Sequence, residues 1–334
     1  MRPKRFAVRG DPKPVGMRTA HAPALSPELL PDFVIDEPPM VRPVVPEAER
    51  EIGVKHTVLT HGYLVLVDYM GNDAAIVQAA RVSYGKGTKT LRDDRGLIRY
   101  LMRHRHTTPF EMVELKFLVR LPIFVARQWI RHRVSSTNEY SARYSVVPDE
   151  YEVPPPEEVR HQSTRNRQGR GDPLPADVVE RFRSDLDRVS KEAYTAYTRA
   201  LDAGVARETA RLLLPVAYYT QWYWKIDLWN LFHFLSLRLD PHAQEEIRLY
   251  AAEMAKIARL VAPIAFEAFE EFTLSGLSLS RREQVAVKAL LDGEPPEAAC
   301  AMAGLALTRE DGKPMTTGEG VEFLEKLARL RSSG

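Results

Sequence analysis

The sequence predicts an α+β protein that carries a proline-rich N-terminal arm and a small helical C-terminal extension. Short apolar or alternating segments, which are typical of β-strands, occur at residues 63–67, 111–121 and 216–224. Longer segments with a helical spacing of apolar residues surround them, most clearly at 176–202 and 241–260. Ten of the 24 prolines fall in the first 50 residues, where no periodic pattern is present, which indicates an extended arm.

The first part of the central region contains two expected strands, and the residues between them favour helices. Gly71 ends the first strand, and Asn72 can cap the helix that follows it. The second strand alternates between apolar and charged residues, which indicates that it is half buried. Pro122 then opens a helix, because its fixed φ suits the first turn. In chain order we expect a strand at 63–67, helices at 72–80 and 91–103, a strand at 111–121 and a helix at 122–129.

The remainder of the chain is loop-rich at first and then mostly helical. Residues 132–175 include three consecutive prolines and a polar stretch at 160–171, which we expect to be a surface loop near the substrate entrance. A break at 274–280 precedes a separate helical unit. The sequence thus predicts an arm at 1–55, a central domain at 56–275 and an extension at 276–334. In the central domain we expect helices at 176–202 and 205–213, a strand at 216–224, and helices at 227–238 and 241–260.

The composition of the chain excludes several classes of protein. Its 334 residues are 44% hydrophobic and 28% charged, as in an ordinary globular protein. The single cysteine, Cys300, excludes a disulfide framework or a multi-cysteine zinc site within one chain, and it fits a reducing compartment. No apolar segment could span a bilayer and the N-terminus has no secretory pattern, so we expect a cytoplasmic protein without a membrane partner. The net charge of +2 gives no reason to expect a nucleic-acid partner.

Positive charge is nevertheless concentrated in one segment. From Arg120 to Arg143 there are five arginines and one acid, Glu139, so the local charge is 5 − 1 = +4. Guanidinium groups followed by Ser, Thr and Asn side chains are the donors that phosphate recognition requires. Trp129 and Tyr144 offer aromatic faces to a planar ring. These residues predict a site for a nucleotide-like ligand, and a solvated basic face or an RNA-binding stretch is the alternative.

Two histidines near an acid raise the question of a metal site. His104 and His106 precede Glu111, but arginines flank both histidines and no third ligand has a matching spacing. We therefore predict that the chain holds no metal ion.

A helical segment near the end of the central domain brings polar groups onto one face. Asn230 and His233 share a face of the predicted helix, and Arg238 lies at its end. On spacing alone, a core helix with satisfied polar residues is the favoured interpretation. Arg211 lies among apolar neighbours, where an arginine requires a buried acid or a ligand anion as its partner.

Taken together, these segments resemble the flavin-dependent thymidylate synthases. The signature of that family is Arg-His-Arg followed by spaced Ser, Asn-Glu, Ser and Arg-Tyr-Ser, and it is unbroken here from Arg131 to Ser145. Supporting segments follow the family pattern in the same order, so the resemblance covers about residues 58–272. These segments lie at 70–73, 80–83, 106–111, 122–129, 210–215 and 237–244.

The resemblance implies a reaction and an assembly. Members of this family make dTMP from dUMP, with methylenetetrahydrofolate as the carbon donor, NADPH as the reductant and FAD as the hydride carrier. The family fold is α+β, with a mixed β-sheet flanked by long helices. The resemblance also implies a homotetramer whose active sites lie between subunits.

The resemblance further assigns roles to individual residues. Arg238 is implied to be catalytic, because a fixed cation beside the uracil ring would stabilise its N3-deprotonated form. His106 and Tyr144 are implied to lie near the flavin and the folate or NADPH. Flavin contacts are implied for Ser83, Thr108, Arg131, His132, Arg133, Glu139, Asp227, Trp229, Asn230 and His233. Contacts with dUMP are implied for Gln128, Arg131, Glu139, Ser141, Ala142, Arg143, Arg211 and Arg238.

Two positions depart from the family pattern, and two others bear on the mechanism. Asp227 and Trp229 stand where many members have Asn and Arg, and an acid beside a phosphate is unfavourable, so we expect Asp227 to face ring or ribose hydroxyls. Cys300 lies beyond the resembling region in an apolar helical setting, which argues against a reactive thiolate. Ser141 lacks an adjacent base and is assigned to binding. We therefore expect no covalent adduct with the enzyme and a hydride supplied by the flavin.

An alternative from another class is a nucleic-acid-binding protein. It would use the arginines of the polar loop together with the C-terminal helices, whose spacing is loosely similar to a helix-turn-helix. The C-terminal segment is not strongly basic, so this pattern is weak. The arginines concerned are Arg160, Arg165, Arg167 and Arg170.

Overall fold

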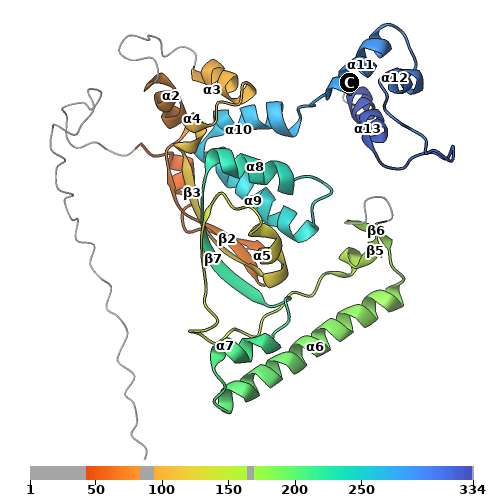
Figure 1. Cartoon of the computed structure of the whole chain (residues 1–334). Helices are drawn as coiled ribbons and strands as arrows, with labels where there is room; N and C mark the ends of the chain where they lie inside the picture. The colour runs from red at the N-terminus through yellow and green to blue at the C-terminus, as the bar shows by residue number, and fades with distance from the viewer. Residues whose placement is uncertain (1–42, 83–93, 164–168, 333–334) are drawn as a thin grey trace, which may run out of the picture. The chain divides into compact units, whose positions relative to one another are not determined.

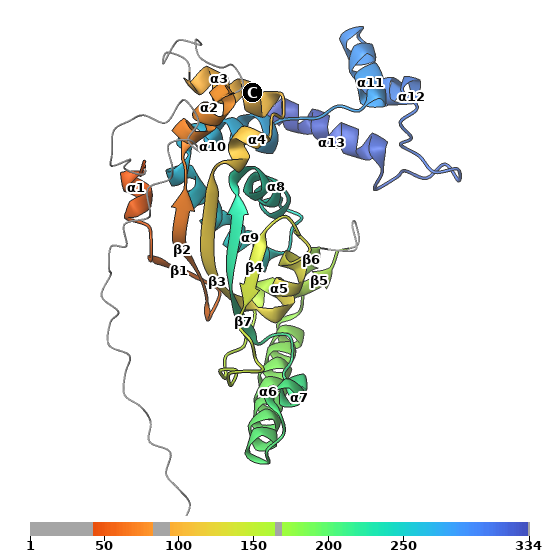
Figure 2. The same ribbon diagram turned by 60° about the vertical axis from the view of Figure 1, so that its left-hand side comes forward.

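The computed structural model describes residues 43–82, 94–163 and 169–332, and the structural statements below concern these residues. The architecture is α+β, as predicted, with a five-stranded sheet and helices packed against it (Figures 1 and 2). None of the described helices is both long and apolar enough to cross a membrane.

The strands of the sheet follow the order β1-β2-β3-β7-β4. We expected a mixed sheet, but all four strand pairs are antiparallel, and the parallel contact in this part of the chain is an isolated bridge between Ile52 and Leu66. The connection between β1 and β2 is only three residues long, and so short a connection can join only antiparallel strands. The strands are β1 (Lys55–Val58), β2 (Gly62–Met70), β3 (Glu114–Pro122), β7 (Tyr219–Asp227) and β4 (Ser136–Glu139).

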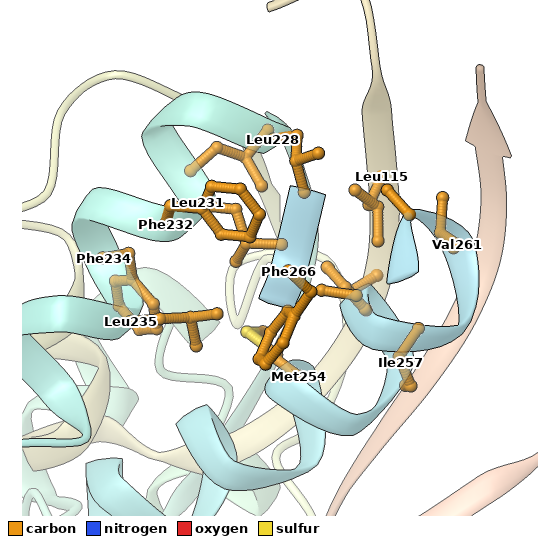
Figure 3. Close-up of a cluster of buried hydrophobic side chains, with 14 of the residues drawn as sticks. Leu115, Leu228, Leu231, Phe232, Phe234, Leu235, Met254, Ile257, Val261 and Phe266 are labelled. Carbon is orange, nitrogen blue, oxygen red and sulfur yellow. The ribbon is translucent and has the colours of Figure 1, made fainter. Parts of the chain in front are cut away.

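One face of the sheet forms the main core. Along β3 the side chains alternate, with Leu115 and Phe117 fully buried and Lys116 partly exposed. Figure 3 shows Leu115 in one apolar cluster with side chains such as Val261 and Phe266. The helices that supply this cluster are α8 (Leu228–Arg238), α9 (Glu245–Val261) and α10 (Pro263–Phe269).

Most of the predicted elements are present, and their bounds differ by a few residues. The helix expected at 176–202 is α6 (Ala176–Asp202), and the strand expected at 216–224 begins three residues later. The sequence did not predict β4, because its four side chains are polar and exposed and give no alternation. The other helices around the sheet are α2 (Asp73–Val82), α3 (Asp94–Arg103), α4 (Thr108–Glu111), α5 (Ile123–Trp129) and α7 (Arg207–Ala210), and a 3-10 turn follows at Arg211–Leu213.

Smaller elements precede and follow the main core. Ala48 of α1 (Pro46–Glu49) is buried in the main cluster. Between β4 and α6, a short helical turn (Pro156–Glu158) leads into a hairpin of β5 (Arg160–Gln162) and β6 (Arg170–Pro173). The C-terminal helices enclose a second, smaller apolar cluster that contains Cys300 and Phe323. These helices are α11 (Arg281–Leu291), α12 (Pro296–Met302) and α13 (Glu319–Ser332).

Candidate active site

The junction of β7 and α8 fixes the polar side chains at the start of α8. Asp227 is the N-cap of this helix, and its carboxylate accepts hydrogen bonds from the backbone N–H of Asn230 at 2.9 Å and from Asn230 Nδ2 at 2.7 Å. Trp229 packs against Phe110 of α4, with ring centroids 5.8 Å apart. The carboxylate of Asp227 therefore both caps the helix and orients the amide of Asn230.

Three of the predicted site residues carry buried polar atoms without a hydrogen-bond partner. Of the seven such side-chain atoms in the described residues, three are Gln128 Oε1, His132 Nε2 and Arg238 Nε. Leaving a buried polar group unpaired costs about 1–3 kcal/mol, so folded proteins contain few of them. Gln128 and Arg238 line the same cavity. A ligand in that cavity could complete the hydrogen bonds of Gln128 and Arg238.

The electrostatics of this region favour an electron-rich ring. Burial lowers the pKa of His132, and the neighbouring His233 and Arg238 lower it further, whereas Asp227 opposes the shift. The rings of His132 and His233 lie 5.5 Å apart between centroids. Burial also lowers the pKa of Arg238. The guanidinium of Arg238 is poorly hydrated and lies near the buried imidazole of His132. It makes this side of the site positively charged, and charge interactions are strong there because little water screens them.

The signature segment continues from this side of the site along the edge of the sheet. After His132 the chain enters β4, which pairs antiparallel with β7 and so leads away from α8. The carboxylate of Glu139 at the end of β4 accepts a hydrogen bond from Thr220 Oγ1 at 2.7 Å. Ser141 follows at the far end of the strand pair, so the two ends of the signature are well separated in one chain.

A second group of predicted residues gathers at that far end. Ala142 packs against the apolar cluster that contains Ala210, the neighbour of Arg211. The backbone N–H of Arg143 donates to Ser141 Oγ at 3.3 Å. Figures 1 and 2 show α7 and α8 at opposite ends of β7. A strand of nine residues spans about 30 Å.

Apart from Glu139 at the end of β4, the predicted dUMP residues form two groups in one chain. We call Gln128 and Arg238, with Arg131 at the end of α5, the first half-site. Ser141, Ala142, Arg143 and Arg211 form the second half-site. Gln128 and Arg238 line one cavity, and none of the second half-site residues line it, so a ligand confined to that cavity would not contact both groups within one chain.

Tyrosine hydroxyls anchor the segment that follows the second half-site. Tyr197 OH accepts from the backbone N–H of Val147 at 3.1 Å, and Tyr194 OH donates to the carbonyl of Val147 at 3.1 Å. Tyr218 OH donates to Asp149 Oδ1 at 2.9 Å. The sequence analysis missed these anchors, because they connect α6 and β7 with residues about 50 to 70 positions away.

Two cavities border α8. The first is lined by Gln128, Ser236 and Arg238, and by Arg160 and Arg170 of the β5–β6 hairpin. The second has a volume of about 480 Å³, and it brings together three predicted flavin residues. Its wall also contains two arginines to which the sequence analysis gave no role. These five residues are Trp229, Asn230, His233, Arg103 and Arg105.

The other predicted residues line neither cavity. In the described part of the chain, no group of three or more His, Cys, Asp or Glu side chains could hold a metal ion. Ser83 lies outside the described residues. Thr108, Arg131, Arg133, His106 and Tyr144 are exposed, and the guanidinium of Arg143 lies over the ring of Tyr144 at 5.5 Å from its centroid.

The fold and the site together are those of a nucleotide-modifying enzyme of the α+β class, with buried unpaired hydrogen-bonding atoms and with arginines along both cavities. Residues 65–264 match the family described as thymidylate synthase complementing protein, and the chain belongs to that family.

Curated relatives and solved structures agree with this membership. The chain is 50% identical over 266 residues to a flavin-dependent thymidylate synthase of Rickettsia bellii, with 76% of this chain and 90% of the relative covered. It is 54% identical over 256 residues to the flavin-dependent thymidylate synthase of Gluconobacter oxydans, with 76% and 84% covered. A crystal structure of the UMP/dUMP methylase PolB from Streptomyces cacaoi bound with 5-Br dUMP is 37% identical. It has a TM-score of 0.59, and the match covers 66% of this chain and 99% of that one.

Proposed function

We propose that the protein is a flavin-dependent thymidylate synthase that methylates dUMP to dTMP, with FAD as cofactor and with methylenetetrahydrofolate and NADPH as co-substrates. Family membership supports the reaction, and the name shared by the relatives supports a flavin. The observation that carries the proposal is the set of unpaired buried atoms on Gln128, His132 and Arg238, three residues to which the family resemblance assigns nucleotide or flavin contacts.

Bound flavin would supply the hydride that reduces the transferred carbon to a methyl group. The residues that would hold it are Trp229, Asn230 and His233 on α8, together with His132 and the exposed Arg131 and Arg133 of the signature. Asn230 is already oriented by Asp227, so its amide needs little reorganisation on binding. The hydrogen-bonding surface and the aromatic wall of the second cavity fit a planar heterocycle with attached phosphates.

Arg238 would act on the pyrimidine ring. Its Nε has no partner in the described residues, and a guanidinium held in place beside the ring would stabilise negative charge that develops on the uracil. Burial and the nearby Glu297 raise the pKa of the Cys300 thiol, so this sulfur is protonated at neutral pH. The Cys300 side chain lies in the C-terminal cluster. The protein would therefore activate uracil by charge and position, without a cysteine nucleophile.

The two half-sites support an active site shared between copies in a homotetramer. Since the cavity lined by Gln128 and Arg238 contains no residue of the second half-site from the same chain, we infer that the first half-site of one subunit meets the second half-site of another. The long helix α6 carries exposed apolar side chains at Val178, Phe182 and Val189, a surface that suits a neighbouring copy. We place the enzyme in the cytoplasm, where a lone thiol stays reduced.

The activity is tested anaerobically with dUMP, methylenetetrahydrofolate and NADPH, by following flavin absorbance and dTMP formation. We expect the flavin to be bleached by NADPH and dTMP to form only when all three substrates are present. A protein that neither binds flavin nor forms dTMP would contradict the proposal.

Sharing of the site is tested by co-expressing two inactive variants with different tags. Arg238→Gln removes the first half-site and Arg211→Gln removes the second, so mixed tetramers should regain activity. The matched control combines Arg238→Gln with Gln128→Ala, which both lie in the first half-site and should stay inactive. Activity restored in the control and not in the test pair would refute the shared site.

A further inference from the structure

The second cavity is lined by arginines and, among the described residues, by no acidic side chain. It lies at the end of α3, beside α8 and the turn that follows α10 (Glu270–Leu274). The residues of the described chain that line it include Arg103, Arg105 and His233, and none of them is Asp or Glu. Its volume of about 480 Å³ is within the range of small-molecule sites. A cavity with two guanidinium groups and no carboxylate attracts anions.

Arg103 at the end of α3 and Arg105 just beyond it differ from the earlier arginines of this helix. Arg95 and Arg99 both form ion pairs with Glu267. Within the described residues, Arg103 and Arg105 form no ion pair, and Arg103 has its guanidinium 5.8 Å from the centroid of the Phe272 ring. The fold therefore neutralises the arginines that lie outside the cavity and leaves the two that line it available to a ligand.

The backbone conformation at Arg105 gives no structural reason for an arginine at this position. Arg105 has φ 56°, the left-handed conformation that glycine adopts most easily at the end of a helix. Its N–H donates to the carbonyl of Met102 at 3.1 Å, and the N–H of His106 donates to Leu101 at 2.9 Å, which completes the helix end. Glycine would make these bonds with less strain. The helix end therefore does not require the arginine.

We propose that Arg103 and Arg105 form a subsite for the pyrophosphate of a dinucleotide, in the cavity that Asn230 and His233 also line. The proposal rests on the proposed function, because the two sources of such a pyrophosphate there are FAD and NADPH. Guanidinium forks bind phosphate oxygens in pairs, and their bonds are strongest where no carboxylate competes. The subsite also provides arginines near Trp229, the position at which the resembling family often has an arginine of its own.

The helix macrodipole offers a competing explanation for these arginines. Cations near the C-terminus of α3 are stabilised by its dipole without any ligand. That effect depends on charge alone and is a few tenths of a kcal/mol to about 1 kcal/mol. It predicts that removing Arg105 lowers stability and leaves pyrophosphate binding unchanged, whereas the subsite predicts the reverse.

The deciding variant is Arg105→Gly, because glycine readily adopts the backbone conformation of Arg105 while removing its whole side chain, including the guanidinium. Binding of inorganic pyrophosphate, FAD and NADPH to the full-length, flavin-free protein is measured by calorimetry or fluorescence. We expect the wild type to bind pyrophosphate and the variant to bind it at least about tenfold more weakly, with an unchanged or higher melting temperature. Arg103→Gln should act in the same direction, and Arg105→Lys should restore part of the affinity. Arg95→Gln, on the same helix but outside the cavity, is the matched control and should bind as the wild type does.

The FAD and NADPH binding measurements show which of the two dinucleotides places its pyrophosphate in the subsite. Weaker binding of FAD with riboflavin unaffected assigns the subsite to the flavin, and weaker binding of NADPH with FAD unaffected assigns it to the reductant. Equal binding of all probes by wild type and Arg105→Gly, or no pyrophosphate binding by the wild type, overturns the proposal. None of these measurements needs turnover, so a protein that binds pyrophosphate through Arg105 but forms no dTMP would contradict only the proposed function.

Discussion

Replacing Arg238 by Met should stabilise the ligand-free protein while abolishing its function. Arg238 holds a buried Nε without a partner, and burial lowers the pKa of its guanidinium. An unpaired buried donor costs about 1–3 kcal/mol, so removing it should raise the free energy of unfolding by about 1–2 kcal/mol. Unfolding entropy of about 2 cal/mol/K per residue gives roughly 0.7 kcal/mol/K for this chain of 334 residues, so the melting temperature should rise by about 1.5–3 °C.

When dUMP is added, the wild type should become more stable than Arg238→Met, although it is the less stable of the two without ligand. At about 100 times its Kd, a ligand that binds only the native state stabilises it by about 2.7 kcal/mol. The wild type should gain this increment and Arg238→Met should not, because the cation for the ionised uracil is missing. The assay is thermal melting with and without dUMP, together with dTMP formation.

Arg259→Met is the matched control, because Arg259 is paired with Glu270 and lies over the ring of Phe266. This variant should melt at a lower temperature and keep the full response to dUMP. If Arg238→Met melts below the wild type without ligand, or responds to dUMP as the wild type does, Arg238 is not held ready for the nucleotide and the reasoning fails.

Three other substitutions test separate parts of the structure. The pKa of His132 is lowered in the folded protein, so the unfolded state binds more protons and the free energy of unfolding should fall as the pH drops below about 6.5. The His132→Asn variant should lose this part of the pH dependence, which is measured by urea unfolding at about pH 7.5 and about pH 5.5. An unchanged dependence would rule out a buried neutral imidazole. Asp227→Ala removes the cap of α8 and should cost about 1 kcal/mol in thermal unfolding as well as weaken FAD binding, whereas Asp227→Asn should retain most of both. Cys300→Ala should leave kcat unchanged and lower stability by about 1 kcal/mol, because it leaves a small cavity in the C-terminal cluster; a large loss of kcat would reopen a thiolate route.

The sequence predicts those elements well whose apolar residues repeat at a fixed spacing. α6 begins and ends where expected, and β3 shows the alternation that its sequence indicates. β4 lacks this signal because Ser136–Glu139 is polar and exposed, yet this strand sets the direction in which the signature runs. Direction and strand pairing depend on contacts far apart in the chain, which a local pattern does not contain.

The same limit applies to the candidate site. The family resemblance predicts which residues meet a nucleotide or flavin, and three of them, Gln128, His132 and Arg238, carry buried polar atoms without a partner. It does not predict that Gln128 and Arg238 line one cavity while Arg211 lies outside it, because that grouping follows from how α5 and α8 pack on the sheet. Arg103 and Arg105 were noted only as neighbours of two histidines, since their relation to α8 is visible only in three dimensions.

The aromatic core beneath the signature gives the protein a built-in optical reporter. The chain has four tryptophans, and Trp129, Trp222 and Trp224 lie in one buried cluster while Trp229 lines the second cavity. The C-terminal helices contain none. Tryptophan emission therefore reports the sheet and the neighbourhood of α8, while far-ultraviolet circular dichroism also records α11, α12 and α13. Comparing the two signals during unfolding would reveal whether the C-terminal helices melt together with the rest of the chain, without attaching a single dye.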